Sequence, residues 1–148
     1  VTTIVEMLDG LKLPMKRIFV KPGGAGALDY DSVDVVLDTF PFSGAVEAAE
    51  ALLHGVPVVT LCGETHTARR SASVLAAAGQ TQWIAADARA YERISCALAE
   101  DVATLRTRRE ALRDAVLASP LTDLAAYTAS VAEALDSYWD EHGAKVNQ

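Results

Sequence analysis

The chain has 148 residues, of which 51% are hydrophobic and 22% charged, and its formal net charge is −7. This length and composition are typical of a soluble globular domain with its own core. The negative charge argues against nucleic-acid binding, because an acidic surface repels the phosphate backbone. No run of about 18 apolar residues occurs, so the sequence predicts no membrane span.

The N-terminal part predicts a helix over 4–11, a short strand over 17–20 and a glycine-rich loop over 21–26. A helical turn is expected over 28–32. The first residue is Val1 rather than Met, and the first helix begins almost at once. We therefore expect the chain to be a fragment of a longer protein.

A strand–helix–strand unit over 33–62 is the most informative segment. The run over 33–37 is apolar apart from one aspartate, which is typical of a strand covered on both faces. A helix over 44–54 and a second buried strand over 58–61 follow it. Ser43 is expected to cap the N-terminus of that helix.

The second half of the chain predicts one more helix and strand, followed by three helices. Their ranges are 67–78, 83–85, 88–99, 102–117 and 123–140. This order predicts an α/β fold: a Rossmann-like, right-handed parallel sheet of about four strands with flanking helices and extra helices at the end. We expect one domain over 1–142 and a frayed tail over 143–148.

Caps and core positions can be predicted in the last helices. Asp87 and Asp101 are suitable N-cap residues for the first two of them. Apolar residues at helical spacing are expected to belong to the core. They are Ile94, Leu98, Leu105, Leu112 and Val116.

Two loops are candidate ligand sites. In parallel sheets, ligands gather at the carboxyl ends of strands, beside helix N-termini whose free amides attract anions. The helix start at Ser43 and Gly44 holds that place, the alternative being a plain serine-capped helix. After the next strand, Thr65, His66 and Arg69 could bind a sugar or a phosphate, the alternative being a capped helix with solvated arginines.

Other sequence features are less informative. The glycines over 23–26 match neither GxGxxG nor the GK[ST] ending of a P-loop, so a flexible loop is the plainer interpretation. Cys62 and Cys96 form no CxxC pair, and we expect buried thiols in a reducing cytoplasm. The sequence indicates no metal-ligand cluster, no cofactor and no identifiable catalytic residue.

Four motifs occur in a specific order: LDTFPFSG over 37–44, GVPVVTL over 55–61, GET followed by Ala-Arg over 63–69, and SPL over 119–121. Together they resemble the C-terminal half of O-GlcNAc transferases, in particular their SPINDLY-type bacterial relatives. The resemblance implies a GT-B fold, in which a sugar nucleotide lies between two Rossmann-like domains. The chain looks like most of the second, donor-nucleotide domain. The resemblance therefore implies that the first β–α piece of that domain and the acceptor-side domain lie outside this sequence.

The resemblance also implies a degenerate phosphate site. The family's loop typically runs Gly, then His or Thr, Thr, Thr, and its hydroxyls and amides hold the diphosphate. The matching positions here are Ala45, Val46 and Glu47. A family aspartate that binds the ribose is matched by Glu50. The family's lysine and histidine around the uridine fall on Gly23 and Gly26, with Lys21 displaced.

Two functions therefore stay open. In the first, the chain is the UDP-sugar half of a protein glycosyltransferase; it meets its protein acceptor through the absent domain and is inactive alone. The UDP-sugar is then a substrate, and no cofactor is required. The resemblance would place near the nucleotide Ser43, Gly44, Glu50, Thr65, His66 and Arg69. In the second, a non-catalytic glycosyltransferase domain serves as a scaffold or interaction module.

Overall fold

The computed structural model of the chain describes residues 14, 16, 18–19 and 29–143. The predicted helix over 4–11, the glycine-rich loop over 21–26 and the end of the predicted tail lie outside these residues. Half of the predicted strand over 17–20 lies outside them as well, and its two described residues, Ile18 and Phe19, are not in a strand.

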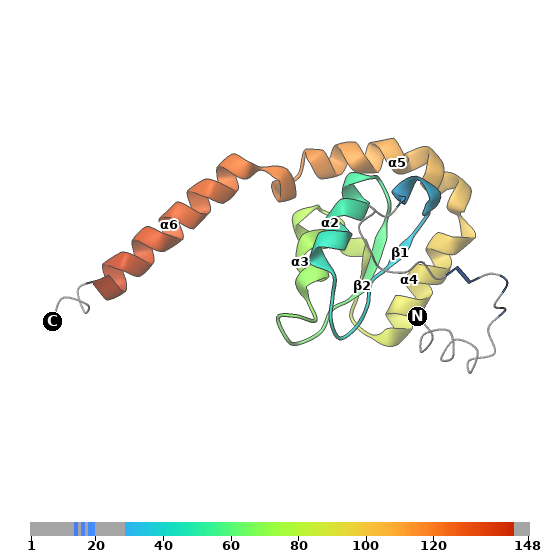
Figure 1. Cartoon of the computed structure of the whole chain (residues 1–148), viewed down its shortest axis with the longest axis horizontal. Helices are drawn as coiled ribbons and strands as arrows, with labels where there is room; N and C mark the ends of the chain where they lie inside the picture. The colour runs from blue at the N-terminus through green and yellow to red at the C-terminus, as the bar shows by residue number, and fades with distance from the viewer. Residues whose placement is uncertain (1–13, 15, 17, 20–28, 144–148) are drawn as a thin grey trace.

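The described part contains a three-stranded parallel sheet with the order β1-β2-β3 (Figure 1). Its strands are β1 (Val36–Leu37), β2 (Val58–Leu61) and β3 (Ile84–Ala85). In the parallel register Val36 lies opposite Val58, and Thr60 lies opposite Ile84. The first strand is shorter than predicted: pairing with β2 starts at Val36, opposite Val58, because the residues before Val58 are Pro57 and the turn that ends α2.

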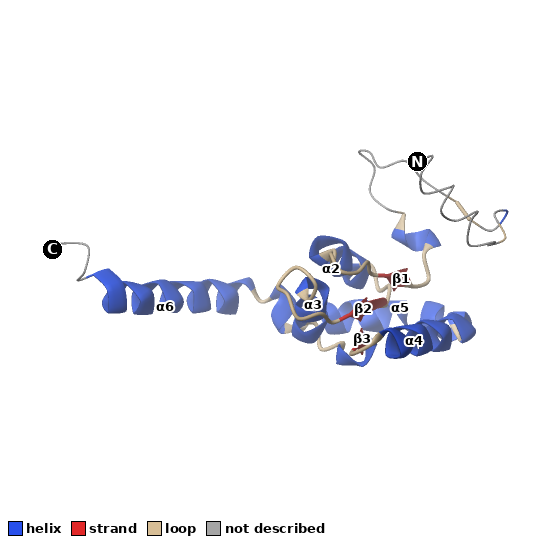
Figure 2. Ribbon diagram, turned by 90° about the horizontal axis from the view of Figure 1, so that it is seen from below, coloured by secondary structure: helices blue, strands red, loops and turns tan. Residues whose placement is uncertain are grey.

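Helices surround this sheet. α2 (Ala45–Leu53) joins β1 to β2, and α3 (Arg70–Ala77) joins β2 to β3. These two pack against each other on one side of the sheet, whereas α4 (Ala88–Glu100) lies on the other side (Figures 1 and 2). α5 (Val102–Leu117) contacts both α2 and α4. Short 3-10 turns are η2 (Tyr30–Ser32), η3 (Thr81–Trp83) and η4 (Pro120–Thr122).

The last helix, α6 (Leu124–His142), projects away from the sheet and its covering helices (Figure 1). Large apolar side chains on it are exposed to solvent. They are Leu124, Tyr127, Val131, Leu135, Tyr138 and Trp139. An exposed apolar stripe of this size on a helix favours contact with another protein surface.

Local sequence signals set most helix ends. The side chains of Asp87, Asp101 and Asp123 each accept a hydrogen bond from the backbone N–H three residues further on, which confirms the first two as N-caps. Gly55 follows α2 and Gly79 follows α3, with φ angles of +70° and +72°. The left-handed conformation there is the usual way for glycine to end a helix.

The core lies between β2, α2, α3 and the end of α5. Its fully buried aliphatic side chains include Leu52, Val56, Val58, Leu75 and Val116. Of the five residues predicted as core in α4 and α5, Val116 is buried, and the other four are only partly buried. All four line a cavity, and Leu112 also packs against the core.

Arginines of α5 hold the segment that precedes β1. Arg109 donates hydrogen bonds to the carbonyl oxygens of Tyr30 and Val33. Arg106 binds Asp34 through two parallel bonds, Nε to Oδ1 at 2.7 Å and Nη2 to Oδ2 at 2.9 Å. The carbonyl of Val33 and the carboxylate of Asp34 are thus bound to α5, and Val36 and Leu37 are the residues of the predicted strand over 33–37 that pair with β2.

Replacing Asp34 with asparagine is expected to reduce the loss of stability in acid. The hydrogen bonds from Arg106 hold the pKa of Asp34 below its ordinary value of 3.8. A carboxyl with a lowered pKa in the folded state contributes stability above about pH 3.8, and that stability is lost as the pH falls through the folded-state pKa. Solvent screening keeps the effect small, since the Arg106 side chain is 66% exposed.

Urea unfolding of wild type and Asp34→Asn, at about pH 6 and about pH 3, measures this effect. The difference in unfolding free energy between the two proteins should shrink at the lower pH. A difference that stays constant between the two pH values would contradict the role given to this ion pair.

Candidate functional site

The loop between β1 and α2 is fixed by the carboxylate of Asp38. Its Oδ2 accepts a hydrogen bond from the Thr60 hydroxyl at 2.7 Å, and its Oδ1 accepts one from the Gly44 N–H at 3.0 Å. The Tyr91 hydroxyl donates to the Asp38 carbonyl at 2.9 Å. Asp38 therefore joins the carboxyl ends of β1 and β2 to the start of α2.

Burial raises the pKa of Tyr91, and the nearby charge of Asp38 raises it further. The phenol therefore stays protonated at neutral pH and acts as the donor to the loop. The sequence analysis gave Asp38 no role of its own. Two signals in the sequence could have identified this role. One is a carboxylate six residues before a helix start, and the other is a threonine inside the next buried strand.

Ser43 does not cap α2, so that prediction is wrong. The N-cap is Gly44, and it makes no side-chain cap bond. Ser43 is only 1% exposed, its hydroxyl donates to the Thr67 carbonyl at 2.8 Å, and it accepts from the Ser71 N–H at 3.2 Å. The hydroxyl therefore links the entry of α2 to the loop before α3, because that loop offers closer partners than α2 does.

Glu47 lies over the N-terminus of α2. It is the third residue after the N-cap Gly44, and a Cβ added to Gly44 would lie 2.7 Å from its Oε2. A carboxylate at this position is stabilised by the positive end of the helix dipole. With Asp38 bound to the Gly44 N–H, two carboxylates of the chain stand where an anionic ligand is expected to bind.

Glu50 lies on α2, one turn beyond Glu47, and is bound inside the chain. The Tyr30 hydroxyl donates to Glu50 Oε2 at 3.2 Å, and the Tyr30 ring stacks on His54 with ring centres 5.0 Å apart. Burial raises the pKa of Tyr30, and its bond to Glu50 raises it further. The exposed Glu50 carboxylate is thus oriented by Tyr30.

The loop after β2 forms a turn before α3 begins. The Ala68 N–H donates to the carbonyl of Thr65 at 3.1 Å and to its hydroxyl at 3.3 Å, so α3 starts three residues later than predicted. Arg69 Nη1 donates to the Glu64 carbonyl at 3.3 Å. Three of the predicted site residues are exposed on this turn: Thr65, His66 and Arg69.

A cavity of about 480 Å³ lies between β1, the loop after it and the first turns of α2. We name it the α2 cavity. Its charged lining comes from Asp38, Glu47 and Arg70, and the Arg70 guanidinium lies 5.7 Å above the ring of Phe42. Of the predicted site residues, Gly44 lines this cavity. The others do not line it: Ser43, Glu50, Thr65, His66 and Arg69.

Neither cysteine is buried, so the expectation of buried thiols is wrong. Cys62 directly follows β2, Cys96 lies on α4, and both are exposed. Within residues 29–143 and the few described before them, no three His, Cys, Asp or Glu side chains gather as a metal site would require. In the same part of the chain, no helix has both the length and the apolarity needed to cross a bilayer.

Comparisons with known proteins agree with the motifs. The model of glycosyl transferase family 41 matches residues 26–131. Two similar proteins are each named probable UDP-N-acetylglucosamine–peptide N-acetylglucosaminyltransferase SPINDLY. The one from Hordeum vulgare is 33% identical over 113 residues, and the one from Petunia hybrida is 34% identical over 110. The matches cover 76% and 74% of this chain but only 12% of each relative.

A solved structure of a mutant O-GlcNAc transferase from Thermobaculum terrenum superposes with a TM-score of 0.83 and 31% sequence identity. The match covers 95% of this chain and 28% of that protein. It confirms the predicted Rossmann-like parallel sheet with extra C-terminal helices, one half of a GT-B glycosyltransferase. The chain therefore spans a minor part of each protein that it resembles.

Proposed function

The chain belongs to glycosyl transferase family 41, and we propose that it supplies the donor half of a protein glycosyltransferase that uses a UDP-sugar. The observation that carries the proposal is the α2 cavity, where the carboxyl end of β1 meets the N-terminus of α2. Nucleotides bind at this place in open α/β sheets. The names of the relatives point to a UDP-sugar donor and a protein acceptor.

In this proposal the diphosphate lies at the start of α2, beside Gly44, where it binds against the charge of the Asp38 and Glu47 carboxylates. Thr65, His66 and Arg69 face the sugar or phosphate from the turn after β2, and Glu50 faces the ribose. Ser43 acts indirectly, by holding the two loops together. Catalysis then consists of placing donor and acceptor together and stabilising the leaving diphosphate.

The chain matches 28% of the related structure, so we propose that activity requires the remaining, acceptor-side part of such a protein. The UDP-sugar is a substrate in this scheme, and the scheme uses no cofactor and no metal. The protein acceptor binds through the acceptor-side part rather than through this chain.

A second candidate function, a non-catalytic scaffold, is favoured by one observation. Asp38 and Glu47 place two carboxylates at the start of α2, where the family's hydroxyl groups would hold phosphate. Losing two or three hydrogen bonds to a charged group, at roughly 1.5–3 kcal/mol each, weakens binding by at least about a hundredfold.

Calorimetric titration of UDP into the full-length protein distinguishes the two functions. A dissociation constant of about 100 µM or tighter is expected for the donor half of a transferase. UMP serves as the matched control: because it lacks the second phosphate, it should bind more weakly than UDP if the start of α2 contacts the diphosphate. Weaker binding of UDP, or no heat at millimolar concentration, would favour the scaffold.

A further inference from the structure

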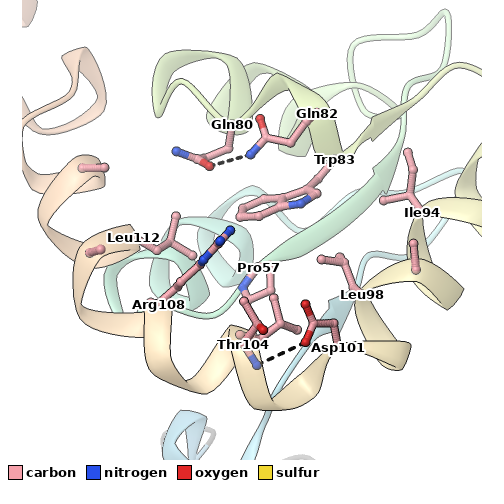
Figure 3. A pocket seen from close by; sticks show the side chains of 15 residues that line it. Pro57, Gln80, Gln82, Trp83, Ile94, Leu98, Asp101, Thr104, Arg108 and Leu112 are labelled. Carbon is pink, nitrogen blue, oxygen red and sulfur yellow. Dashed lines mark hydrogen bonds between the residues drawn. The ribbon is translucent and has the colours of Figure 1, made fainter.

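A second cavity, of about 770 Å³, lies at the amino ends of β2 and β3 (Figure 3). We name it the α4–α5 cavity. The segment before β2, η3, the second half of α4 and most of α5 enclose it. It shares no lining residue with the α2 cavity, so the two are separate sites.

Most of the α4–α5 cavity wall is apolar. Side chains from η3, α4 and α5 form it, chiefly Trp83, Ile94, Leu98, Leu105 and Leu112. The aliphatic residues among them were predicted as core from their helical spacing, and in the structure they line this cavity. A mostly apolar cavity with a few polar groups is the usual form of a small-molecule site.

The cavity has few polar side chains, and they differ in whether they are already bound to other groups of the chain. Figure 3 shows Arg108 reaching from α5 toward Pro57 and Trp83. No ion pair joins Arg108 to any other residue that the structure describes. Asp101, the one carboxylate of the lining, accepts from the Thr104 N–H and caps α5.

On the opposite wall, Gln82 Nε2 donates to Gln80 Oε1 at 2.8 Å. This bond leaves the second N–H of Gln82 and the N–H groups of Gln80 as further donors, one of which binds the Ala78 carbonyl. The cavity therefore combines an aromatic wall, a guanidinium and amide donors.

We propose that the α4–α5 cavity binds an aromatic anion: a flat apolar molecule that carries one carboxylate or sulfonate. Trp83 offers an aromatic surface to the flat body of the ligand, and Arg108 offers charge and paired donors to its anionic end. Among the described residues of the lining, Arg108 is the one cation and Asp101 the one carboxylate, so the proposal places the anionic end of the ligand at Arg108 and away from Asp101, which stays charged although it accepts from the Thr104 N–H. This site is independent of UDP-sugar binding at α2.

The probe that tests the proposal is 8-anilinonaphthalene-1-sulfonate. The chain has two tryptophans, and Trp139 lies on the exposed face of α6. In a Trp139→Phe background Trp83 is the remaining tryptophan, so the quenching signal comes from the wall of this cavity, and the Arg108 and Ala111 variants show whether the probe itself is bound there. We expect saturable quenching with one probe per chain.

Arg108→Gln in the same background is expected to weaken probe binding about tenfold, since a charged hydrogen bond is lost. Arg113→Gln is the matched control: it removes the same charge from α5 outside the cavity lining and should leave binding unchanged. The uncharged probe N-phenyl-1-naphthylamine should bind both variants equally. UDP binding should not change in Arg108→Gln.

A second variant, Ala111→Phe, fills part of the cavity and should abolish binding, with circular dichroism checking that the helices remain. Unchanged probe affinity in Arg108→Gln or in Ala111→Phe would overturn the proposal. A dimer would be a further contrary result. The proposal would fail if sedimentation showed a dimer, if Leu135→Glu on α6 dissociated that dimer, and if the probe bound only to the dissociated chain. In that case a second copy of the chain would fill the cavity.

Discussion

Replacing Gly55 with alanine is expected to lower the free energy of unfolding by about 3 kcal/mol or more. The residue has a φ of +70°, and an added Cβ would lie 2.2 Å from the carbonyl oxygen of Arg109. That oxygen belongs to the backbone of α5, which is itself held through the Arg109 side chain. The clash therefore cannot be relieved by rotating a flexible side chain.

Gly79→Ala is the matched control for this prediction. Gly79 has nearly the same φ, +72°, but nothing lies within 4 Å of an added Cβ. Its replacement should cost only the left-handed conformation, about 1–2 kcal/mol. Urea unfolding followed by circular dichroism measures both variants. Equal losses of unfolding free energy in the two variants would show that the close contact between Gly55 and Arg109 does not increase the cost of the substitution.

Removing the charge of Glu47 is expected to strengthen UDP binding at least about tenfold. Two unit charges about 4 Å apart repel by roughly 4 kcal/mol at an effective dielectric constant near 20. Because Glu47 is exposed, solvent screens this repulsion, and we count only about a third of it, which still corresponds to tenfold. Calorimetry with Glu47→Gln isolates the charge, and Glu47→Thr adds the hydroxyl that the family's loop carries.

Glu110→Gln is the control for the change in net charge. Glu110 is exposed on α5 and does not line the α2 cavity. Glu110→Gln should leave the affinity for UDP unchanged. The gain in affinity with Glu47→Thr should equal or exceed the gain with Glu47→Gln. No gain in either Glu47 variant would mean that its carboxylate turns aside when the nucleotide binds.

Features that depend on neighbouring residues could be predicted from the sequence. Asp87 and Asp101 cap helices through bonds that span three residues, and Gly55 and Gly79 end helices through their own backbone angles. These signals are local, so spacing along the chain is enough to identify them. The family resemblance gave the overall architecture, which the superposition confirms.

Features that depend on distant residues could not be predicted in this way. Ser43 has the right position for a cap, but the carbonyl of Thr67 and the N–H of Ser71 compete for its hydroxyl. The sequence singled out Arg69 as the arginine that could bind a ligand, whereas the structure places Arg70 on the α2 cavity. Helical periodicity identified the apolar face of α4 and α5 without showing how closely the two helices pack.

The buried hydroxyl of Ser43 connects the loop before α2 to the loop before α3. Its bonds to Thr67 and Ser71 lie away from water, where an unmade hydrogen bond is costly. While these bonds are intact, the turn carrying Thr65 and Arg69 therefore cannot shift unless the first turn of α2 moves with it. Under the proposed function, a ligand that contacts one of these loops would therefore also restrict the motion of the other.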